Sequence, residues 1–218
     1  KTMFEDQENC FYYVTTMNEN YVQPELPVGA EEGIIKGMYQ LPVLQTAKGE
    51  TGSGLRVTLM GAGTILNEVI AAAEILKEDY GVAADIWALT SVNELVREGQ
   101  SVDRWNLLHP TQQAKQSYIA KQLGDSTAPV IVATDYMKNY AEQLRAYVAS
   151  PMHVLGTDGF GRSDSRAALR HFFEVDRHFV AVSALKALAD QGKIDASLVA
   201  SAITSFGIDP DKANPLTM

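Results

Sequence analysis

The sequence predicts an α/β fold in which a mostly parallel sheet is covered on both faces by helices. Short apolar segments alternate with segments whose apolar residues recur at helical spacing, the pattern of parallel strands joined by crossover helices. Hydrophobic residues make up 46% of the 218 residues, which is ample for a core. Residues 130–134 form an apolar run, as expected for a central strand buried on both faces.

The first 54 residues predict a strand, a helix and a linker. Residues 10–16 are rich in aromatic and β-branched types, which favour a strand. Residues 30–39 predict a short helix, with acids at its start and Lys36 later, the order that a helix dipole favours. The polar, glycine-rich residues 45–54 predict a linker.

The alternating pattern begins at residue 55. Residues 55–60 predict a strand, and residues 64–80 predict a helix because Ile65, Val69 and Ala72 recur at helical spacing. Gly81 follows that helix as a left-handed cap. Three more strands are predicted at 83–89, 130–134 and 152–155. The other predicted helices are 92–97, part of 101–107, 116–123, 136–148, 165–173, 176–191 and 195–206.

Charge and composition exclude several classes of protein. A net charge of −9 argues against binding to nucleic acid or to an anionic membrane, because both need a basic surface. No apolar run approaches the roughly 20 residues that span a bilayer, and no secretory signal opens the chain. Cys10 is the only cysteine, so we expect a reducing cytoplasm. The chain starts at Lys1 and enters a predicted strand almost at once, which indicates a fragment of a longer protein.

A glycine-rich loop at residues 156–165 lies between a predicted strand and a predicted helix. Such a loop can cradle a phosphate on helix amides, or it can dock another domain. The acidic side chains of the loop would repel an anion. Ser163 or Asp164 is predicted to cap the following helix. We therefore favour a docking loop, in which Arg162 pairs with a carboxylate of a neighbouring domain. Its interface or cleft-rim candidates are Asp158, Gly159, Phe160, Gly161, Arg162 and Asp164.

A second glycine pair, Gly61 and Gly63, occupies the place of a dinucleotide-binding fingerprint. The third glycine of that fingerprint is replaced by Leu66, and residues 86–90 lack the acid expected near the end of the second strand. A tight turn is the better prediction.

The histidines do not predict a metal site. His171, Glu174 and His178 would share a face on one continuous helix, but Asp176 is predicted to start a new helix and to separate them. His109, before Pro110, is predicted to pack or to form a surface hydrogen bond, with a channel-lining role as the alternative. His153 lies in a short strand and is predicted to be structural.

Polar and aromatic side chains gather at the end of the first predicted strand. In parallel α/β folds such strand ends border ligand clefts. The alternative, which we favour, is a strand edge that packs on a missing upstream domain. The cluster consists of Tyr12, Tyr13, Asn18, Glu19 and Tyr21. Ser163 and Ser165 lack the Gly-x-Ser-x-Gly context of a serine hydrolase.

Four collinear blocks resemble a known family. They are residues 11–21 with 29–39, residues 104–110, residues 134–138, and residues 154–166 running on to 171–176. Together they closely resemble the C-terminal part of the homodimeric bacterial pyruvate dehydrogenases, the decarboxylating first component of the pyruvate dehydrogenase complex. The resemblance covers essentially the whole chain.

The resemblance implies a domain organisation. Residues 1–44 would end a pyrimidine-binding domain, residues 45–54 would be a linker, and residues 55–218 would form a transketolase-like C-terminal domain. That domain would be a three-layer α/β/α sandwich of about five strands, mostly parallel with one antiparallel edge.

The resemblance also implies a reaction for the whole enzyme. Thiamine diphosphate and magnesium would serve to decarboxylate pyruvate, and the lipoyl group of the acetyltransferase component would then be reductively acetylated. The Gly-Asp-Gly…Asn motif of the family is absent from these residues, so no catalytic, cofactor or metal residue is carried over. The leading hypothesis is a domain that docks on the upstream domains, contributes to the dimer and forms part of the rim of the active-site cleft. The alternatives are a Rossmann-like or flavodoxin-like nucleotide-binding enzyme, or a non-catalytic interaction module.

Overall fold

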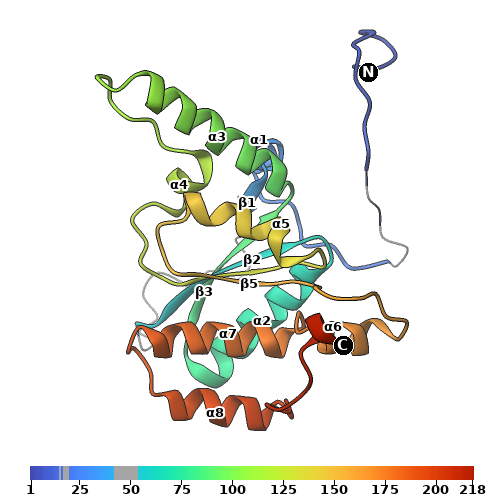
Figure 1. Cartoon of the computed structure of the whole chain (residues 1–218), viewed down its shortest axis with the longest axis vertical. Helices are drawn as coiled ribbons and strands as arrows, with labels where there is room; N and C mark the ends of the chain where they lie inside the picture. The colour runs from blue at the N-terminus through green and yellow to red at the C-terminus, as the bar shows by residue number, and fades with distance from the viewer. Residues whose placement is uncertain (15, 17–19, 42–53) are drawn as a thin grey trace.

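The computed structural model describes residues 1–14, 16, 20–41 and 54–218, and its centre is a five-stranded sheet (Figure 1). The strand order is β1-β3-β2-β4-β5. β2, β3, β4 and β5 run parallel to one another, and β1 pairs with β3 in the antiparallel sense. The strands are β1 (Met38–Gln40), β2 (Arg56–Ala62), β3 (Ala83–Leu89), β4 (Val130–Ala133) and β5 (Met152–Leu155). The predicted mostly parallel sheet with one antiparallel edge is confirmed.

Helices cover both faces of this sheet, which confirms the three-layer sandwich (Figure 1). One outer layer holds α2 (Ile65–Tyr80), α7 (Arg177–Asp190) and α8 (Ala196–Ser205). The other holds α3 (Val92–Leu108), α4 (Tyr118–Leu123), α5 (Lys138–Glu142) and the 3₁₀ helix η2 (Gln143–Tyr147). The remaining helices are α1 (Glu31–Lys36), α6 (Arg166–Phe172) and η3 (Pro215–Thr217).

Each layer closes its own hydrophobic core against the sheet. Along β2, Val57 and Leu59 belong to the core under α2 and α7, whereas Met60 and Ala62 belong to the core under α3 and η2. Successive strand side chains point to opposite faces, so an apolar strand supplies both cores at once. The apolar run at β4 behaves as predicted for a central strand: all four residues are buried.

Several predicted helices have different bounds in the structure. The helix predicted at 30–39 ends at Lys36, and residues 38–40 form the strand β1 instead. The helical segments predicted at 92–97 and 101–107 are one helix, α3, that continues through Gly99. A Cβ at Gly99 would lie 2.6 Å from the Tyr147 ring, so the glycine lets η2 pack closely on α3 rather than ending the helix. The helix predicted at 136–148 starts at Lys138 and tightens to 3₁₀ geometry from Gln143. The predicted cap Gly81 is confirmed in the left-handed region, with φ of 63°.

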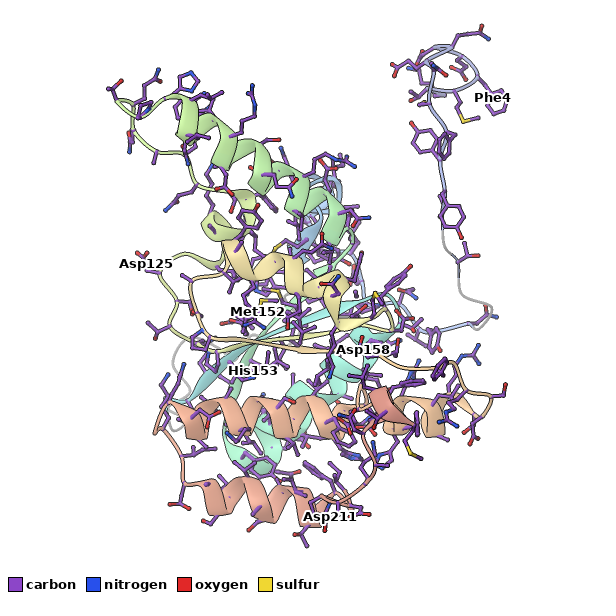
Figure 2. All side chains as sticks on the ribbon, in the orientation of Figure 1. Phe4, Asp125, Met152, His153, Asp158 and Asp211 are labelled. Carbon is purple, nitrogen blue, oxygen red and sulfur yellow. The ribbon has the colours of Figure 1, made fainter. Side chains whose placement is uncertain are left out.

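The strand predicted at 10–16 is wrong for the part that the structure describes. Residues 10–14 and 16 are irregular, and Tyr13 is 86% exposed. β-propensity gives a strand only where a neighbouring strand supplies hydrogen bonds, and no such neighbour is found in the described part of the chain. Figure 2 shows Phe4 at the far end of this segment, away from the sheet.

The predicted linker lies outside the described residues except for Gly54. β1 precedes it and is hydrogen-bonded to β3, so residues 38–40 share one sheet with residues 56–155. The division into domains at 1–44, 45–54 and 55–218 otherwise stays a prediction. No helix in the described ranges is long and apolar enough to cross a membrane.

Candidate functional site

The glycine loop 156–165 is anchored at its start to the segment that follows β4. The Thr157 amide donates to the Tyr136 carbonyl at 2.9 Å, and the Thr157 hydroxyl donates to the Asp135 carbonyl at 2.7 Å. The Asp158 carboxylate accepts from the first amide of α5, that of Lys138, at 3.1 Å. A carboxylate at a helix start is favoured by the helix dipole, so Asp158 holds the loop to α5.

The three glycines of the loop have different reasons to be glycine. Gly156 lies so close to the next segment that a Cβ would be 2.7 Å from the Tyr136 carbonyl oxygen. Gly159 has φ of 102°, and a Cβ there would collide with the Pro215 carbonyl. Gly161 has nothing within 4 Å of its Cβ position. The loop is therefore fixed up to Gly159, and from Phe160, which is 78% exposed, it faces solvent.

The prediction that Ser163 or Asp164 caps α6 is wrong. The cap is Ser165, whose hydroxyl accepts from the Ala168 amide at 3.3 Å. Asp164 instead accepts from the adjacent Ser165 amide at 2.6 Å. Ser165 has the extended backbone of an N-cap, with ψ of 152°, which places its hydroxyl at the third amide of α6.

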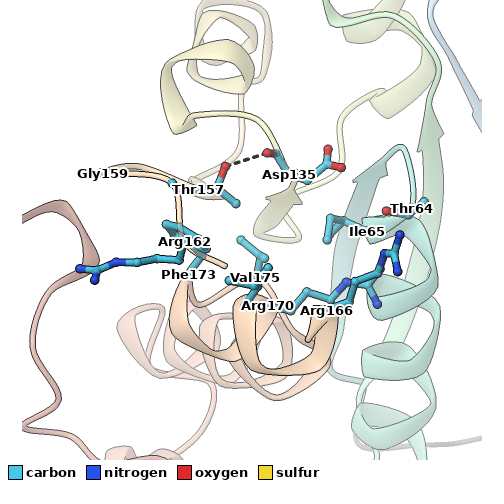
Figure 3. A pocket seen from close by; sticks show the side chains of 12 residues that line it. Thr64, Ile65, Asp135, Thr157, Gly159, Arg162, Arg166, Arg170, Phe173 and Val175 are labelled. Carbon is cyan, nitrogen blue, oxygen red and sulfur yellow. Dashed lines mark hydrogen bonds between the residues drawn. The ribbon is translucent and has the colours of Figure 1, made fainter. Parts of the chain in front are cut away.

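A pocket of about 350 Å³ lies beside this loop (Figure 3). The segments after β2, β4 and β5 and the helix α6 all contribute to it. Its apolar lining is Ile65, Leu169, Phe173 and Val175. Its polar lining includes Thr64, Asp135, Thr157, Arg162, Arg166 and Arg170. Only Gly159, Gly161 and Arg162 of this lining were candidates on sequence grounds.

The buried carboxylate of Glu68 fixes the positions of two arginines, Arg170 in the pocket lining and Arg177 next to it. Glu68 is 5% exposed and accepts from Arg170 Nη1 at 3.1 Å and from Arg177 Nε at 3.0 Å. Burial acts to raise the pKa of Glu68, but the hydrogen bonds and charges of Arg177 and the charge of Arg170 outweigh it and lower the pKa. Arg170 also donates to the Tyr21 hydroxyl at 3.2 Å. Glu68 is not among the residues predicted for a site, although a carboxylate between Ile65 and Ala72 on the apolar stripe of α2 signals a buried partner.

Asp135 is the carboxylate that lines the pocket itself. Burial raises the pKa of Asp135, and its own backbone amide and Arg170 offset this only in part. The lining therefore combines three arginines with one weakly acidic carboxylate. Such a pocket favours a negatively charged ligand or side chain.

The other predicted site residues are scattered. Tyr21 reaches the pocket region through Arg170, whereas Asn18 and Glu19 lie outside the described residues. His109 ends α3 in the opposite layer, where its ring stacks on Trp105 with centroids 4.3 Å apart. The packing interpretation of His109 fits this geometry.

The break at Asp176 is confirmed and separates the residues of the rejected metal site. Asp176 caps α7 and lies 3.0 Å from His171 Nδ1. Glu174 pairs with Lys212 at 2.9 Å, and His178 stacks on Phe206. No group of three metal-binding side chains is found among the described residues.

The turn at Gly61 and Gly63 is a close strand-to-helix connection. A Cβ at Gly61 would lie 2.6 Å from the Leu66 Cα, and Gly63 has φ of 58°. Both glycines are thus explained by packing and by backbone conformation.

Sequence comparisons decide the family. The profile of the transketolase-like C-terminal domain matches residues 37–176, which include all five strands, the glycine loop and α6. The chain belongs to the family of transketolase-like C-terminal domains. Residues 1–24, ahead of this domain, match the middle domain of the pyruvate dehydrogenase E1 component.

Relatives of this transketolase-like domain are similar over its whole length. The pyruvate dehydrogenase E1 component of Pseudomonas aeruginosa is 58% identical over 99% of this chain and 24% of that protein. The same component of Escherichia coli K12 is 54% identical over 97% of this chain and 23% of its own length. The chain therefore spans about a quarter of these relatives. Among solved structures, a transketolase variant from Pichia stipitis has a TM-score of 0.49 and 20% identity, over 76% of this chain and 20% of that one.

Proposed function

We propose that the chain is the C-terminal domain of a pyruvate dehydrogenase first component. The whole enzyme would use thiamine diphosphate and magnesium to decarboxylate pyruvate, and would then reductively acetylate the lipoyl group of the dihydrolipoyl acetyltransferase component. The observation that carries the proposal is the 58% identity to a pyruvate dehydrogenase E1 component over 99% of the chain. A reducing cytoplasm suits the single cysteine, Cys10.

The described residues of this chain do not fit the cofactor site. The Gly-Asp-Gly…Asn motif is absent from the sequence, and the Asp158 carboxylate is hydrogen-bonded to the Lys138 amide. The described residues group no three histidine, cysteine or acidic side chains around a metal position. We therefore assign cofactor binding and catalysis to parts of the enzyme outside this chain.

The role that we propose for this domain is structural. It would dock on upstream domains of the same polypeptide, contribute to a homodimer and form part of the rim of the active-site cleft. The loop suits this role because Gly156 and Gly159 fix its base while Phe160 and Arg162 are exposed beyond it. Exposed aromatic and arginine side chains on a fixed support are typical anchors of protein interfaces.

The test uses the full-length polypeptide that contains this chain. With thiamine diphosphate and magnesium we expect release of CO₂ from pyruvate and acetylation of a lipoyl domain in the same assay. Sedimentation should show a dimer. A full-length preparation that binds the cofactor but leaves pyruvate unchanged would contradict the proposed reaction, and a monomeric active enzyme would contradict the dimer.

A further inference from the structure

The end of the segment that matches the middle domain lies against α6. Residues 1–24 match the middle domain of the pyruvate dehydrogenase E1 component, and residues 37–176 match the transketolase-like C-terminal domain. The Tyr21 hydroxyl accepts a hydrogen bond from Arg170 of α6 at 3.2 Å, so a residue of the first match contacts a helix of the second. Glu68 accepts from the same arginine at 3.1 Å, so the contact is supported by a buried carboxylate. The polypeptide therefore reaches the C-terminal domain beside α6.

The segment between α8 and η3 is fastened to the same corner of the domain. Lys212 Nζ donates to the Phe172 carbonyl and to the Glu174 carboxylate, both at 2.9 Å, at the end of α6. Hydrogen bonds between an ammonium group and a carboxylate are among the stronger ones, so Lys212 holds this segment in place. Further on, the Pro215 carbonyl lies so close to Gly159 that a Cβ on the glycine would collide with it. The glycine loop and η3 thus form one continuous surface.

This surface exposes three large apolar side chains. Phe160, which follows Gly159 in the loop, is 78% exposed, and Leu216 and Met218 are 60% and 52% exposed. The pocket of about 350 Å³ adjoins the loop, and Figure 3 shows Gly159 and Phe173 among the residues that line it. Exposed apolar side chains beside a hollow are typical of surfaces that bind another protein domain.

The course of the polypeptide indicates which partner covers this surface. The chain spans about a quarter of the pyruvate dehydrogenase E1 components that it matches, and in a full-length polypeptide the middle domain would continue upstream of it. The contact between Tyr21 and Arg170 places the connection at α6, which directly follows the glycine loop. A domain tethered so closely has an effective concentration on the order of millimolar at the adjoining surface, whereas a second copy arrives at its concentration in solution. The tethered middle domain is therefore the favoured occupant.

We propose that the middle domain of the same polypeptide packs on the surface formed by Phe160, Leu216 and Met218, with one of its apolar side chains in the adjoining pocket. Removal of these side chains from water would drive the contact. The inference rests on the proposed function, because it requires that this chain is the C-terminal domain of a longer enzyme. It adds the identity of the docking domain and the contribution of η3.

Photo-cross-linking in the full-length polypeptide tests the proposal. Phe160 and Leu216 are replaced, one at a time, by the photo-cross-linker p-benzoylphenylalanine, and the cross-linked peptides are identified by mass spectrometry. The matched control position is Leu107, which is 77% exposed at the end of α3. Figure 1 shows that end of α3 far from the C-terminus. We expect both surface positions to cross-link to peptides of the middle domain, and the control position to give none of these products.

The mass of the products on a denaturing gel separates the possible partners. A cross-link within one polypeptide leaves its mass unchanged, whereas a cross-link to a second copy doubles it. Products of doubled mass alone would assign the surface to a second copy and overturn the proposal. An absence of products from both surface positions would also overturn it, because the surface would then face solvent. The same middle-domain products from all three positions would show unspecific capture and would contradict it too.

The docking and the reaction can fail independently. Pyruvate turnover is measured on the unsubstituted enzyme, and the cross-links are read from peptides without any turnover. An inactive polypeptide that gives the expected cross-links would contradict the proposed reaction alone. An active enzyme that gives none would contradict the docking alone.

Discussion

Glu68 and Arg177 join the first turn of α2 to the first turn of α7 through three hydrogen bonds. The Glu68 carboxylate accepts from the Arg177 amide and from its Nε, both at 3.0 Å, and from its Nη2 at 3.2 Å. The same carboxylate accepts from Arg170 of α6. One side chain thus ties together three helices around the pocket, and its position near two helix N-termini favours its charge.

Replacing Glu68 by glutamine should destabilise the domain. Glu68→Gln keeps the shape but removes the charge that two arginines share, so we expect a loss of about 1.5–3 kcal/mol in the free energy of unfolding. Urea denaturation of the chain measures this. The matched control is Glu78→Gln on the exposed side of α2, which should change stability by no more than about 0.5 kcal/mol. Equal effects of the two substitutions would show that the shared carboxylate does not hold the helices.

The contribution of Glu68 should depend on pH. Its pKa is lowered in the folded domain from the ordinary value of 4.5, because the stabilising effect of Arg177 and Arg170 on the ionised form exceeds the effect of burial. The stabilisation is therefore complete well above pH 4.5 and is lost as the pH falls through the lowered pKa. We expect the stability difference between wild type and Glu68→Gln to shrink on acidification. A difference that stays constant down to the acid transition would contradict this assignment.

Gly159 and Gly161 should respond in opposite ways to substitution by alanine. Gly159→Ala forces a side chain into a left-handed conformation and into the Pro215 carbonyl, so it should destabilise the domain by more than about 1 kcal/mol. Gly161→Ala meets nothing within 4 Å and should be neutral or stabilising by about 0.4–1 kcal/mol. Thermal unfolding of both variants compares them directly. A larger loss in Gly161→Ala would mean that the solvent-facing half of the loop is also constrained.

Arg162→Ala separates docking from folding. Arg162 lies 5.0 Å from the Phe172 ring and is otherwise exposed, so the isolated chain should lose no more than about 1 kcal/mol of stability. In the full-length enzyme we expect weaker assembly or lower activity, because the proposed partner carboxylate lies on another domain or subunit. Arg97→Ala on α3 is the control. If Arg162→Ala strongly destabilises the isolated chain, the arginine is an internal structural residue instead.

Calorimetric titration of the chain with thiamine diphosphate and magnesium tests where the cofactor binds. We expect no saturable binding to residues 1–218, because the diphosphate motif is absent. The full-length polypeptide should bind both. Micromolar binding to the chain alone would reveal a cofactor site within it and would overturn the assignment of catalysis to other domains.

Much of the layered fold could be predicted from local patterns. The bounds of β3 and β5 match the predicted segments 83–89 and 152–155. A short apolar run that is bounded by turn residues and flanked by predicted helices is compatible with few structures other than a strand. Asp176 could be recognised as a helix start because a cap is a local interaction between neighbouring residues. The antiparallel edge of the sheet was expected only through a family resemblance, and the strand order was not predicted.

Contacts between distant segments decided what local patterns could not. The sequence by itself determined the alternating helices and strands and the break before α7. Only the tertiary structure brought Glu68, Arg170 and Tyr21 together, across 102 residues in one pair and 149 in the other. It also left residues 10–14 irregular, since β-propensity needs a neighbouring strand. The physical reason is common to these cases: buried charges and strand edges depend on partners that spacing along the chain does not specify.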